Sequence, residues 1–235
     1  VDIAGSSLFE IQVKHCKEDP WENLRLLSAA MPNTRLRAGT RSNGIVTFHL
    51  TPDSVMDLWI RRLAANGIRS FWIYDGLFNI DKIGRLARVA RAEGCEAVPT
   101  MLFSSSPYHT DDYYAARAAE LAALDVDAIE IEDASGVLTP ERTRSLCRRV
   151  KKAIGKKRLE LHFHNNTGLA PLNYIEGIEQ GADTIHSACR PLANGVAHPS
   201  TEAMLRNVEC KGWSHGVDLQ TVERVSEKLR AIAEQ

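Results

Sequence analysis

Two histidines placed two positions apart are the residues of this chain whose spacing most directly allows chemistry. His162 and His164 lie in the run 161–168, which ends in the turn-forming sequence Asn-Asn-Thr-Gly. Side chains two residues apart on a β-strand project from the same face, and neutral imidazole is the commonest metal ligand in proteins. The pair predicts a divalent metal site. The alternative is that both histidines are hydrogen-bonded polar residues of a half-buried strand.

Length and composition indicate an ordinary soluble globular protein. The chain has 235 residues, of which 44% are hydrophobic and 25% are charged, and its formal net charge is -1. These values fit a single barrel domain over residues 1–235. Because the basic residues form no stripe, we expect no nucleic-acid partner. Because no apolar run reaches the roughly 18 residues of a membrane span, we expect no membrane segment.

The cysteines indicate a reducing compartment. The five of them are widely separated and include no Cys-x-x-Cys pair, which argues against a disulfide framework and against a thiolate metal site. The N-terminus shows no signal-peptide pattern. We therefore expect a cytoplasmic protein.

Short β-rich runs alternate with amphipathic helical stretches along the chain. The runs recur about every thirty residues, which is the length of one strand-helix unit. Helices are predicted to begin at Thr51-Pro52 and Thr139-Pro140, where threonine caps the helix and proline takes its first position. A last helix is predicted over 218–234, with an apolar face. The seven expected strands span residues 1–4, 34–39, 70–74, 97–103, 128–131, 160–164 and 184–187.

This repeat predicts an α/β fold, the (β/α)8 TIM barrel. A doubly wound open sheet is less favoured because the first strand-turn-helix lacks a Gly-x-Gly-x-x-Gly loop. Only seven strands are expected, and the chain opens directly on one of them. Since an open edge of buried strands invites aggregation, we expect that the first strand-helix unit is missing from this sequence or that a partner covers the gap.

In a TIM barrel the functional residues lie at the C-terminal ends of the strands. This rule gathers nine residues around one mouth: Arg41, Asp75, Ser104, Glu132, Asp133, His162, His164, Asn165 and Arg190. On the strand near 128–132 both isoleucines face the helices, so Glu130 and Glu132 point to the interior. Glu130 lies deeper and is assigned to structure.

Each remaining candidate has a chemical role and a plain alternative. Glu132 is expected either to ligate the metal and act in catalysis or to form a structural ion pair with Arg41. Arg41 has a planar guanidinium that suits a substrate carboxylate. The alternative is that it forms a surface salt bridge. Asp75 is a candidate catalytic residue that supports the reacting groups or simply forms a turn. Asn165 and Arg190 are expected to bind substrate.

Several motifs extend over nearly the whole chain and carry a resemblance. They are Glu-Asp-Pro-Trp-Glu-Asn-Leu at 18–24, Met-Pro-Asn-Thr at 31–34 with Arg41 following, Ser-Pro-Tyr-His-Thr at 106–110, Asp-Ala-Ser-Gly-Val-Leu-Thr-Pro at 133–140, and His162-x-His164. With these motifs the chain resembles the carboxyltransferase barrel of pyruvate carboxylases and oxaloacetate decarboxylase α subunits, within the hydroxymethylglutaryl-CoA lyase-like superfamily.

The resemblance implies a reaction and its cofactors. Members of that family move a carboxyl group between biotin and a 2-oxo acid through an enolate that a divalent metal stabilises. It implies that His162 and His164 bind zinc, manganese or magnesium, and that Arg41 binds substrate. Because the chain has no Met-Lys-Met biotin-attachment sequence, biotin would be carried by another protein. The implied partners are an oxo acid or acyl-CoA, a biotin carrier or biotin carboxylase subunit, and further copies of the chain in a homo-oligomer.

The chain departs from the family pattern inside the site. Glu132 replaces a lysine that becomes carbamylated to ligate the metal, and Val196 replaces the threonine that shuttles a proton between biotin and the enolate. The residues after Val196, usually Ser-Gln, are Ala197 and His198. Three further polar positions have become aromatic, namely Trp72, Phe78 and Phe103.

These departures leave three functions open. The first is a divergent biotin-dependent carboxyltransferase or decarboxylase, which makes the protein an enzyme. The second is a C–C lyase that works without biotin, since Val196 has no hydroxyl. The third is a non-catalytic scaffold subunit that keeps the histidines as structure. A phosphate-binding or carbohydrate-binding barrel is disfavoured because no glycine-rich cradle is present.

Overall fold

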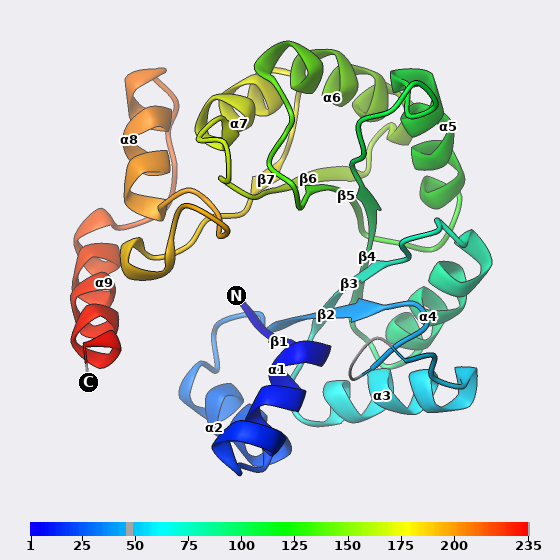
Figure 1. Cartoon of the computed structure of the whole chain (residues 1–235), viewed down its shortest axis with the longest axis vertical. Coiled ribbons are helices and arrows are strands. Elements are labelled where there is room, and N and C mark those ends of the chain that lie inside the picture. The colour runs from blue at the N-terminus through cyan, green and yellow to red at the C-terminus, as the bar shows by residue number, and fades with distance from the viewer. Residues whose placement is uncertain (46–48, 235) are drawn as a thin grey trace. The chain divides into compact units, whose positions relative to one another are not determined.

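Strands and helices alternate along the chain (Figure 1). The structure, a computed structural model, describes residues 1–45 and 49–234. Seven strands join one sheet in chain order, and β1 with β2, β2 with β3, β3 with β4 and β6 with β7 pair in parallel. The strands are β1 Asp2–Gly5, β2 Arg37–Arg41, β3 Ser70–Tyr74, β4 Glu96–Leu102, β5 Ala128–Asp133, β6 Arg158–Phe163 and β7 Thr184–Ile185.

The helices fill the connections between these strands. They are α1 Ser6–Ile11, the π-helical η1 Gln12–Cys16, α2 Pro20–Ala30, α3 Asp53–Ala65, α4 Ile80–Ala92, α5 Asp111–Ala122, α6 Pro140–Ile154, α7 Ala170–Glu179, the 3₁₀ turn η2 Arg190–Leu192, α8 Thr201–Cys210 and α9 Leu219–Ala233. None of the described helices combines the length and the apolar character needed to cross a bilayer.

The strand-helix repeat confirms the predicted α/β class and the order of elements of a TIM barrel, with seven strands among the described residues. All seven predicted strands are present. The strand predicted over 34–39 begins later, at Arg37, because the Thr34 N–H closes a turn onto the Met31 carbonyl at 3.1 Å. The prediction therefore counts turn residues as strand.

The chain forms two compact units. The first consists of Val1–Leu102 and Arg117–Glu130, and the second of Phe103–Ala116 and Ile131–Gln235. In the first, β1 to β4 pair in sequence and α3 packs against α4. In the second, α6 packs against α7, α7 against α8 and α8 against α9. The single domain expected over 1–235 stays a prediction.

Two predicted helix starts have different outcomes. Helix α6 begins as predicted, because the Thr139 hydroxyl accepts a hydrogen bond from the Arg142 N–H at 3.2 Å and Pro140 follows. The prediction for α3 is wrong in its cap. Pro52 is the N-cap residue there, and the Thr51 hydroxyl instead accepts from the Ile45 N–H at 3.3 Å.

The predicted last helix is present as α9, but its predicted apolar face is largely exposed. Asp218 caps it by accepting from the Gln220 N–H at 3.1 Å. Val225 and Ile232 on that face are 41% and 65% exposed. The buried residue of this helix is Ser226, whose hydroxyl donates to the Glu202 carboxylate of α8. A polar contact therefore joins α9 to α8.

The cysteines carry no disulfide, as predicted. All five are free, and Cys95 and Cys147 are buried. Burial raises the pKa of the Cys147 thiol to about 12. Since the thiolate is the reactive form, this cysteine is a packing residue.

A buried ion pair supports the structural assignment of Glu130 in the first unit. Its side chain is fully buried, and one carboxylate oxygen lies 3.2 Å from Nη2 of Arg37. The other accepts from the Thr100 hydroxyl at 3.1 Å. A charge buried this deeply requires a partner, because desolvation of an isolated carboxylate is costly.

We predict that Arg37→Met lowers the free energy of unfolding by about 3–5 kcal/mol, because it removes the cation that faces Glu130. Arg35→Met is the matched control. Arg35 also pairs with a glutamate, Glu96, but its side chain is 61% exposed, so the loss should stay below about 1 kcal/mol. Urea denaturation measures both. Equal losses would contradict the structural role of the Arg37–Glu130 pair.

Candidate metal centre

Strand β6 sets the direction of the predicted histidine pair. Leu161 and Phe163 are fully buried, as expected for the apolar face of the strand. Phe163 is anchored by Tyr174, whose ring stacks on it with centroids 5.0 Å apart and whose hydroxyl accepts from its N–H at 2.8 Å. His162 and His164 therefore project from the other face, and their ring centroids lie 5.5 Å apart.

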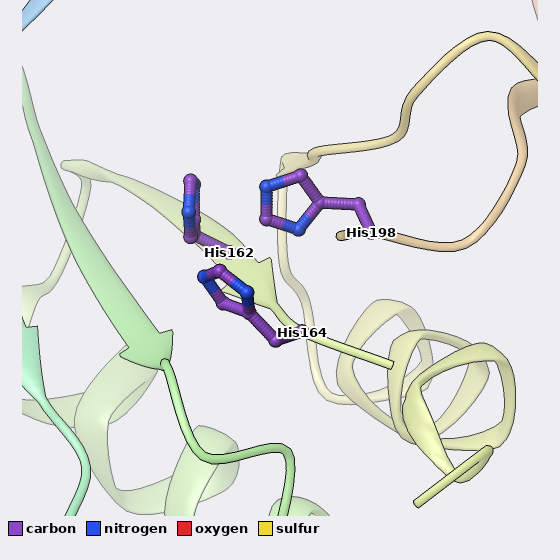
Figure 2. A group of neighbouring side chains, drawn as sticks. All are labelled: His162, His164 and His198. Atoms are coloured by element: carbon purple, nitrogen blue, oxygen red, sulfur yellow. The ribbon is translucent and has the colours of Figure 1, made fainter. Parts of the chain in front are cut away.

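A third imidazole joins the pair. Figure 2 shows His162, His164 and His198 turned toward a common space, with His198 arriving from a separate loop. One ligand nitrogen of each ring lies within 4.8 Å of the other two. The His198 centroid is 4.1 Å from that of His162 and 4.9 Å from that of His164. His162 is buried, and the other two are partly exposed. The three rings thus bring together the ligand atoms that a metal ion requires.

Backbone carbonyls fix the tautomers of two of these rings. The Nδ1 atom of His164 lies 2.6 Å from the Val196 carbonyl oxygen, and Nδ1 of His198 lies 2.9 Å from the Phe163 carbonyl oxygen. Because a carbonyl oxygen only accepts, each Nδ1 must carry the proton. The lone pair of each neutral ring is therefore on Nε2, the nitrogen that is left available to a ligand.

The loop that carries His198 is tied to the end of β6. The Asn165 N–H donates to the Ala197 carbonyl at 2.8 Å, and the Asn194 N–H donates to the His198 carbonyl at 2.7 Å. The Asn165 amide also donates to the Asn194 side chain at 3.1 Å. Asn194 and Gly195 have φ values of 69° and 55°, a left-handed pair that asparagine and glycine tolerate best. This tight turn brings His198 back to the strand.

A second histidine and a carboxylate lie behind His162. The Nδ1 atoms of His162 and His186 are 2.8 Å apart, so one of them donates to the other. On its far side, Nε2 of His186 lies 3.5 Å from a carboxylate oxygen of the buried Glu160. When His162 donates through Nδ1, its Nε2 carries the lone pair, and His186 directs its own Nε2 proton to Glu160. Hydrogen-bonded partners of this kind orient a ligating histidine and raise its basicity.

Sequence reasoning identified neither His186 nor His198 as part of a centre. His186 directly follows β7 and lies within the strand predicted over 184–187, so the rule for C-terminal strand ends could have found it. His198 lies in the loop after that strand, and its sequence signal is that it is a further histidine after the His-x-His motif.

The other predicted residues of the second unit lie nearby in sequence but differ in their contacts. Glu132 is 8% exposed at the end of β5, and it is not a member of the three-histidine group within the described residues. Its metal and catalytic roles stay predictions. Asn165 belongs to the loop contact next to His164. The Arg190 guanidinium is 53% exposed and faces Glu202 at 3.8 Å, so its substrate role also stays a prediction.

In the first unit, Arg41 ends β2 and Asp75 directly follows the neighbouring strand β3. Arg41 donates from Nε to the Tyr74 hydroxyl at 2.9 Å, and both residues line a cavity of about 420 Å³. The buried Asp75 accepts from the Ser42 hydroxyl and from the N–H groups of Leu77 at 2.8 Å and Asn79 at 3.1 Å. These contacts fit the turn-forming alternative for Asp75, and its catalytic role stays a prediction.

Two of the three aromatic departures, Trp72 and Phe103, pack against other rings. Trp72 lies opposite Gly39 in the β2–β3 register and stacks on Tyr74 with centroids 5.0 Å apart. A Cβ atom at Gly39 would lie 2.3 Å from the Trp72 ring, so the glycine makes room for the tryptophan. In the second unit Phe103 is 9% exposed and stacks on Tyr114 at 5.8 Å, and burial raises the pKa of that tyrosine.

Comparison with known proteins gives consistent matches. Residues 79–229 match the model of the family described as HMGL-like. A pyruvate carboxylase subunit from Methanocaldococcus jannaschii is 30% identical over the whole chain, which covers 41% of that protein. The 2-oxoglutarate carboxylase large subunit of Hydrogenobacter thermophilus is 29% identical over 99% of the chain, which covers 36% of that protein.

A solved structure shares the fold. The carboxyl transferase domain from Rhizobium etli pyruvate carboxylase, solved with pyruvate, matches with a TM-score of 0.94 at 23% identity, covering the whole chain and 40% of that chain. The chain thus spans about two fifths of the length of these relatives. Together the matches confirm the resemblance that the motifs predicted.

Gly136, which lies against the backbone of His164, allows a test of how rigid this backbone is. We predict that Gly136→Ala destabilises the protein by clearly more than Gly168→Ala does. Both glycines have left-handed φ values, 65° and 80°, so alanine costs each of them about 1–2 kcal/mol. A Cβ at Gly136 would also lie 2.7 Å from the His164 carbonyl oxygen, whereas at Gly168 it meets nothing within 4 Å.

Urea denaturation of the two glycine variants measures this difference. We expect Gly136→Ala to cost at least about 1 kcal/mol more, because the backbone that carries His164 must move. Equal costs would mean that this backbone yields without penalty.

Proposed function

Because the chain belongs to the HMGL-like family, we propose that it is a carboxyltransferase that acts on a 2-oxo acid or acyl-CoA, with a divalent metal and with biotin carried by another protein. The observation that carries the proposal is the convergence of His162 and His164, with the Nδ1 proton of His164 held by a carbonyl. The named relatives, one a pyruvate carboxylase component and the other a 2-oxoglutarate carboxylase component, support the substrate class.

The residues present fit a divalent metal. His162 and His164 offer neutral imidazole nitrogens on one face of β6, and hydrogen bonds to their other nitrogens orient the rings. Imidazole suits zinc better than it suits magnesium or manganese, so zinc is the first choice of the three expected metals. When bound, such an ion supplies a Lewis acid that polarises a substrate carbonyl.

Arg41 is proposed to bind the substrate carboxylate. Its guanidinium is oriented by the Tyr74 hydroxyl at 2.9 Å and lines a cavity of about 420 Å³, a volume in the range of small-molecule sites. A planar guanidinium presents two parallel donors to a carboxylate. Asn165 and Arg190 are proposed as further substrate contacts, and Glu132 as an additional metal ligand or base.

The residues present do not fit the usual proton transfer to biotin. Val196 stands where the resemblance places the shuttling threonine, and its side chain is 81% exposed and lacks a hydroxyl. Only its backbone serves the centre, through the carbonyl that accepts from His164. We therefore assign no proton step to biotin. We place the protein in the cytoplasm as a homo-oligomer that works with a biotin carrier or biotin carboxylase subunit.

Oxaloacetate decarboxylation tests this function. We predict that the zinc-loaded or manganese-loaded protein converts oxaloacetate to pyruvate and that free biotin or a biotinylated carrier accelerates the reaction. His162→Ala and His164→Ala should each reduce the metal-dependent rate at least about 100-fold. Pyruvate is measured by coupled reduction with lactate dehydrogenase, and the same metal without protein gives the background rate of oxaloacetate decarboxylation.

The same assay separates the alternatives. If the protein cleaves an oxo acid or acyl thioester at a rate that biotin does not change, it is a lyase. The missing hydroxyl at Val196 also argues against the usual biotin chemistry. A protein that binds metal but turns over none of these substrates would be a scaffold subunit, and the catalytic proposal would fail.

The substrate role of Arg41 has its own prediction. Arg41→Lys should raise KM for the oxo acid about 10-fold to 100-fold. The lysine replaces a bidentate guanidinium–carboxylate contact with a single point charge, which weakens substrate binding by about 1.5–3 kcal/mol. Arg88→Lys, on the exposed side of α4, is the control and should leave KM unchanged. Steady-state kinetics at saturating metal measures both. An unchanged KM for Arg41→Lys would remove this arginine from the substrate site.

A further inference from the structure

We propose that His198 is a third imidazole ligand, so that the metal is held by His162, His164 and His198 in a site that selects zinc-class ions over magnesium. This inference rests on the metal dependence in the proposed function and adds a ligand of this chain's own. The family pattern described above has glutamine at position 198, so the third imidazole is a departure rather than part of the resemblance.

The distances fit a compact metal site. In tetrahedral zinc sites the Zn–N distance is about 2.0–2.1 Å, which places ligand nitrogens about 3.4 Å apart. The ligand nitrogens of the three rings lie within 4.8 Å of one another, so rotations of the side chains bring them to this spacing. His198 is the ring best able to adjust, because it stands on a loop that follows the Asn194-Gly195 turn.

The tautomers also fit. The Nδ1 protons of His164 and His198 are held by the carbonyls of Val196 and Phe163, which places each lone pair on Nε2. Figure 2 shows ring nitrogens of all three histidines facing the space between them. Ring nitrogens that bear lone pairs repel one another at this spacing, and a bound cation converts the repulsion into three attractive contacts.

The ligand set determines the class of metal. Three neutral imidazoles favour zinc, cobalt, nickel or copper, whereas magnesium prefers oxygen ligands and water. With Glu132 acting as the base rather than as a ligand, three protein ligands leave a fourth position open for substrate, as in catalytic zinc sites. When the His162 Nδ1 donates to His186, with Glu160 beyond, the hydrogen bond strengthens the same preference by raising the basicity of the His162 ring.

A competing role for His198 is proton transfer in place of the hydroxyl missing at Val196. The geometry favours the ligand role, because His198 lies with its ring centroid 4.1 Å from that of His162 and directs its Nδ1 proton to a backbone carbonyl. The two roles differ in what they do to metal affinity. A proton carrier changes the rate and leaves the affinity for the ion unchanged.

His198→Asn removes the proposed ligand atom but keeps the hydrogen bond that ties the loop to the Phe163 carbonyl. The asparagine amide reaches about as far as Nδ1 and retains a donor for the Phe163 carbonyl, but it has no atom at the Nε2 position. His215→Asn is the matched control, since His215 pairs with Glu209 at 3.3 Å in the same unit and lies outside the three-histidine group. His198→Gln, which restores the family residue, is the second variant if the first fails to fold.

The measurement is metal binding, independent of turnover. Chelator-treated protein is titrated with Co²⁺ and followed by its visible absorption, and then Zn²⁺ displaces the cobalt. We expect one ion per chain with an intense low-coordinate cobalt spectrum. His198→Asn should weaken Zn²⁺ affinity at least about 100-fold and reduce the intensity of the spectrum, while Mg²⁺ binding stays weak in every variant and His215→Asn behaves like the parent protein.

Two results would overturn the inference. If folded His198→Asn or His198→Gln keeps both the parent Zn²⁺ affinity and the cobalt spectrum, His198 is not a ligand, and the carboxyltransferase proposal stands with two histidines. If the parent protein binds neither cobalt nor zinc, the three-histidine site fails together with the metal dependence. A parent protein that binds zinc through three histidines but shows no carboxyl transfer supports this inference and rejects the proposed function.

Discussion

The hydrogen bonds from Nδ1 of His164 and His198 to backbone carbonyls are the contacts on which the candidate centre depends. They are short, 2.6 and 2.9 Å, and they run in opposite directions between strand β6 and the loop that carries His198. Each segment therefore orients a histidine of the other. The Phe163 carbonyl is itself held in place because its residue is buried and stacked on Tyr174. Ordinary core packing thus determines the direction of an imidazole on a loop.

Two departures from the family pattern, Val196 and Trp72, are explained by contacts in the structure. Val196 has lost the hydroxyl that its position usually supplies, yet its carbonyl orients His164, a contact that needs no particular side chain. Trp72 occupies space that Gly39 leaves open, which converts a polar position into packed aromatic surface. The chain keeps the two histidines of the family motif, whereas Glu132 stands in place of the carbamylated lysine and Val196 in place of the proton-shuttling threonine. We infer that the chemistry is retuned around the retained pair of imidazoles.

Much of the fold could be predicted because its signals are local. The period of two along β6 placed Leu161 and Phe163 opposite His162 and His164, and the Thr139-Pro140 cap marked the start of α6. The parts that failed depend on tertiary contacts. Thr51 bonds to a loop rather than to its helix, and the buried residue of α9 is Ser226, which donates to Glu202, while Val225 and Ile232 of the apolar stripe are exposed. His198 was missed as a partner because, although Asn194-Gly195 signals a turn, the placement of the ring depends on its tertiary contact with the Phe163 carbonyl.

Anomalous X-ray diffraction from crystals of the zinc-loaded protein, collected at the zinc edge, shows directly whether three imidazoles hold the ion. We expect one strong anomalous peak bonded to Nε2 of His162, His164 and His198, with each Zn–N distance about 2.0–2.1 Å. A peak elsewhere, a zinc bonded through Nδ1 of His164, or a zinc from which His198 is turned away would contradict it.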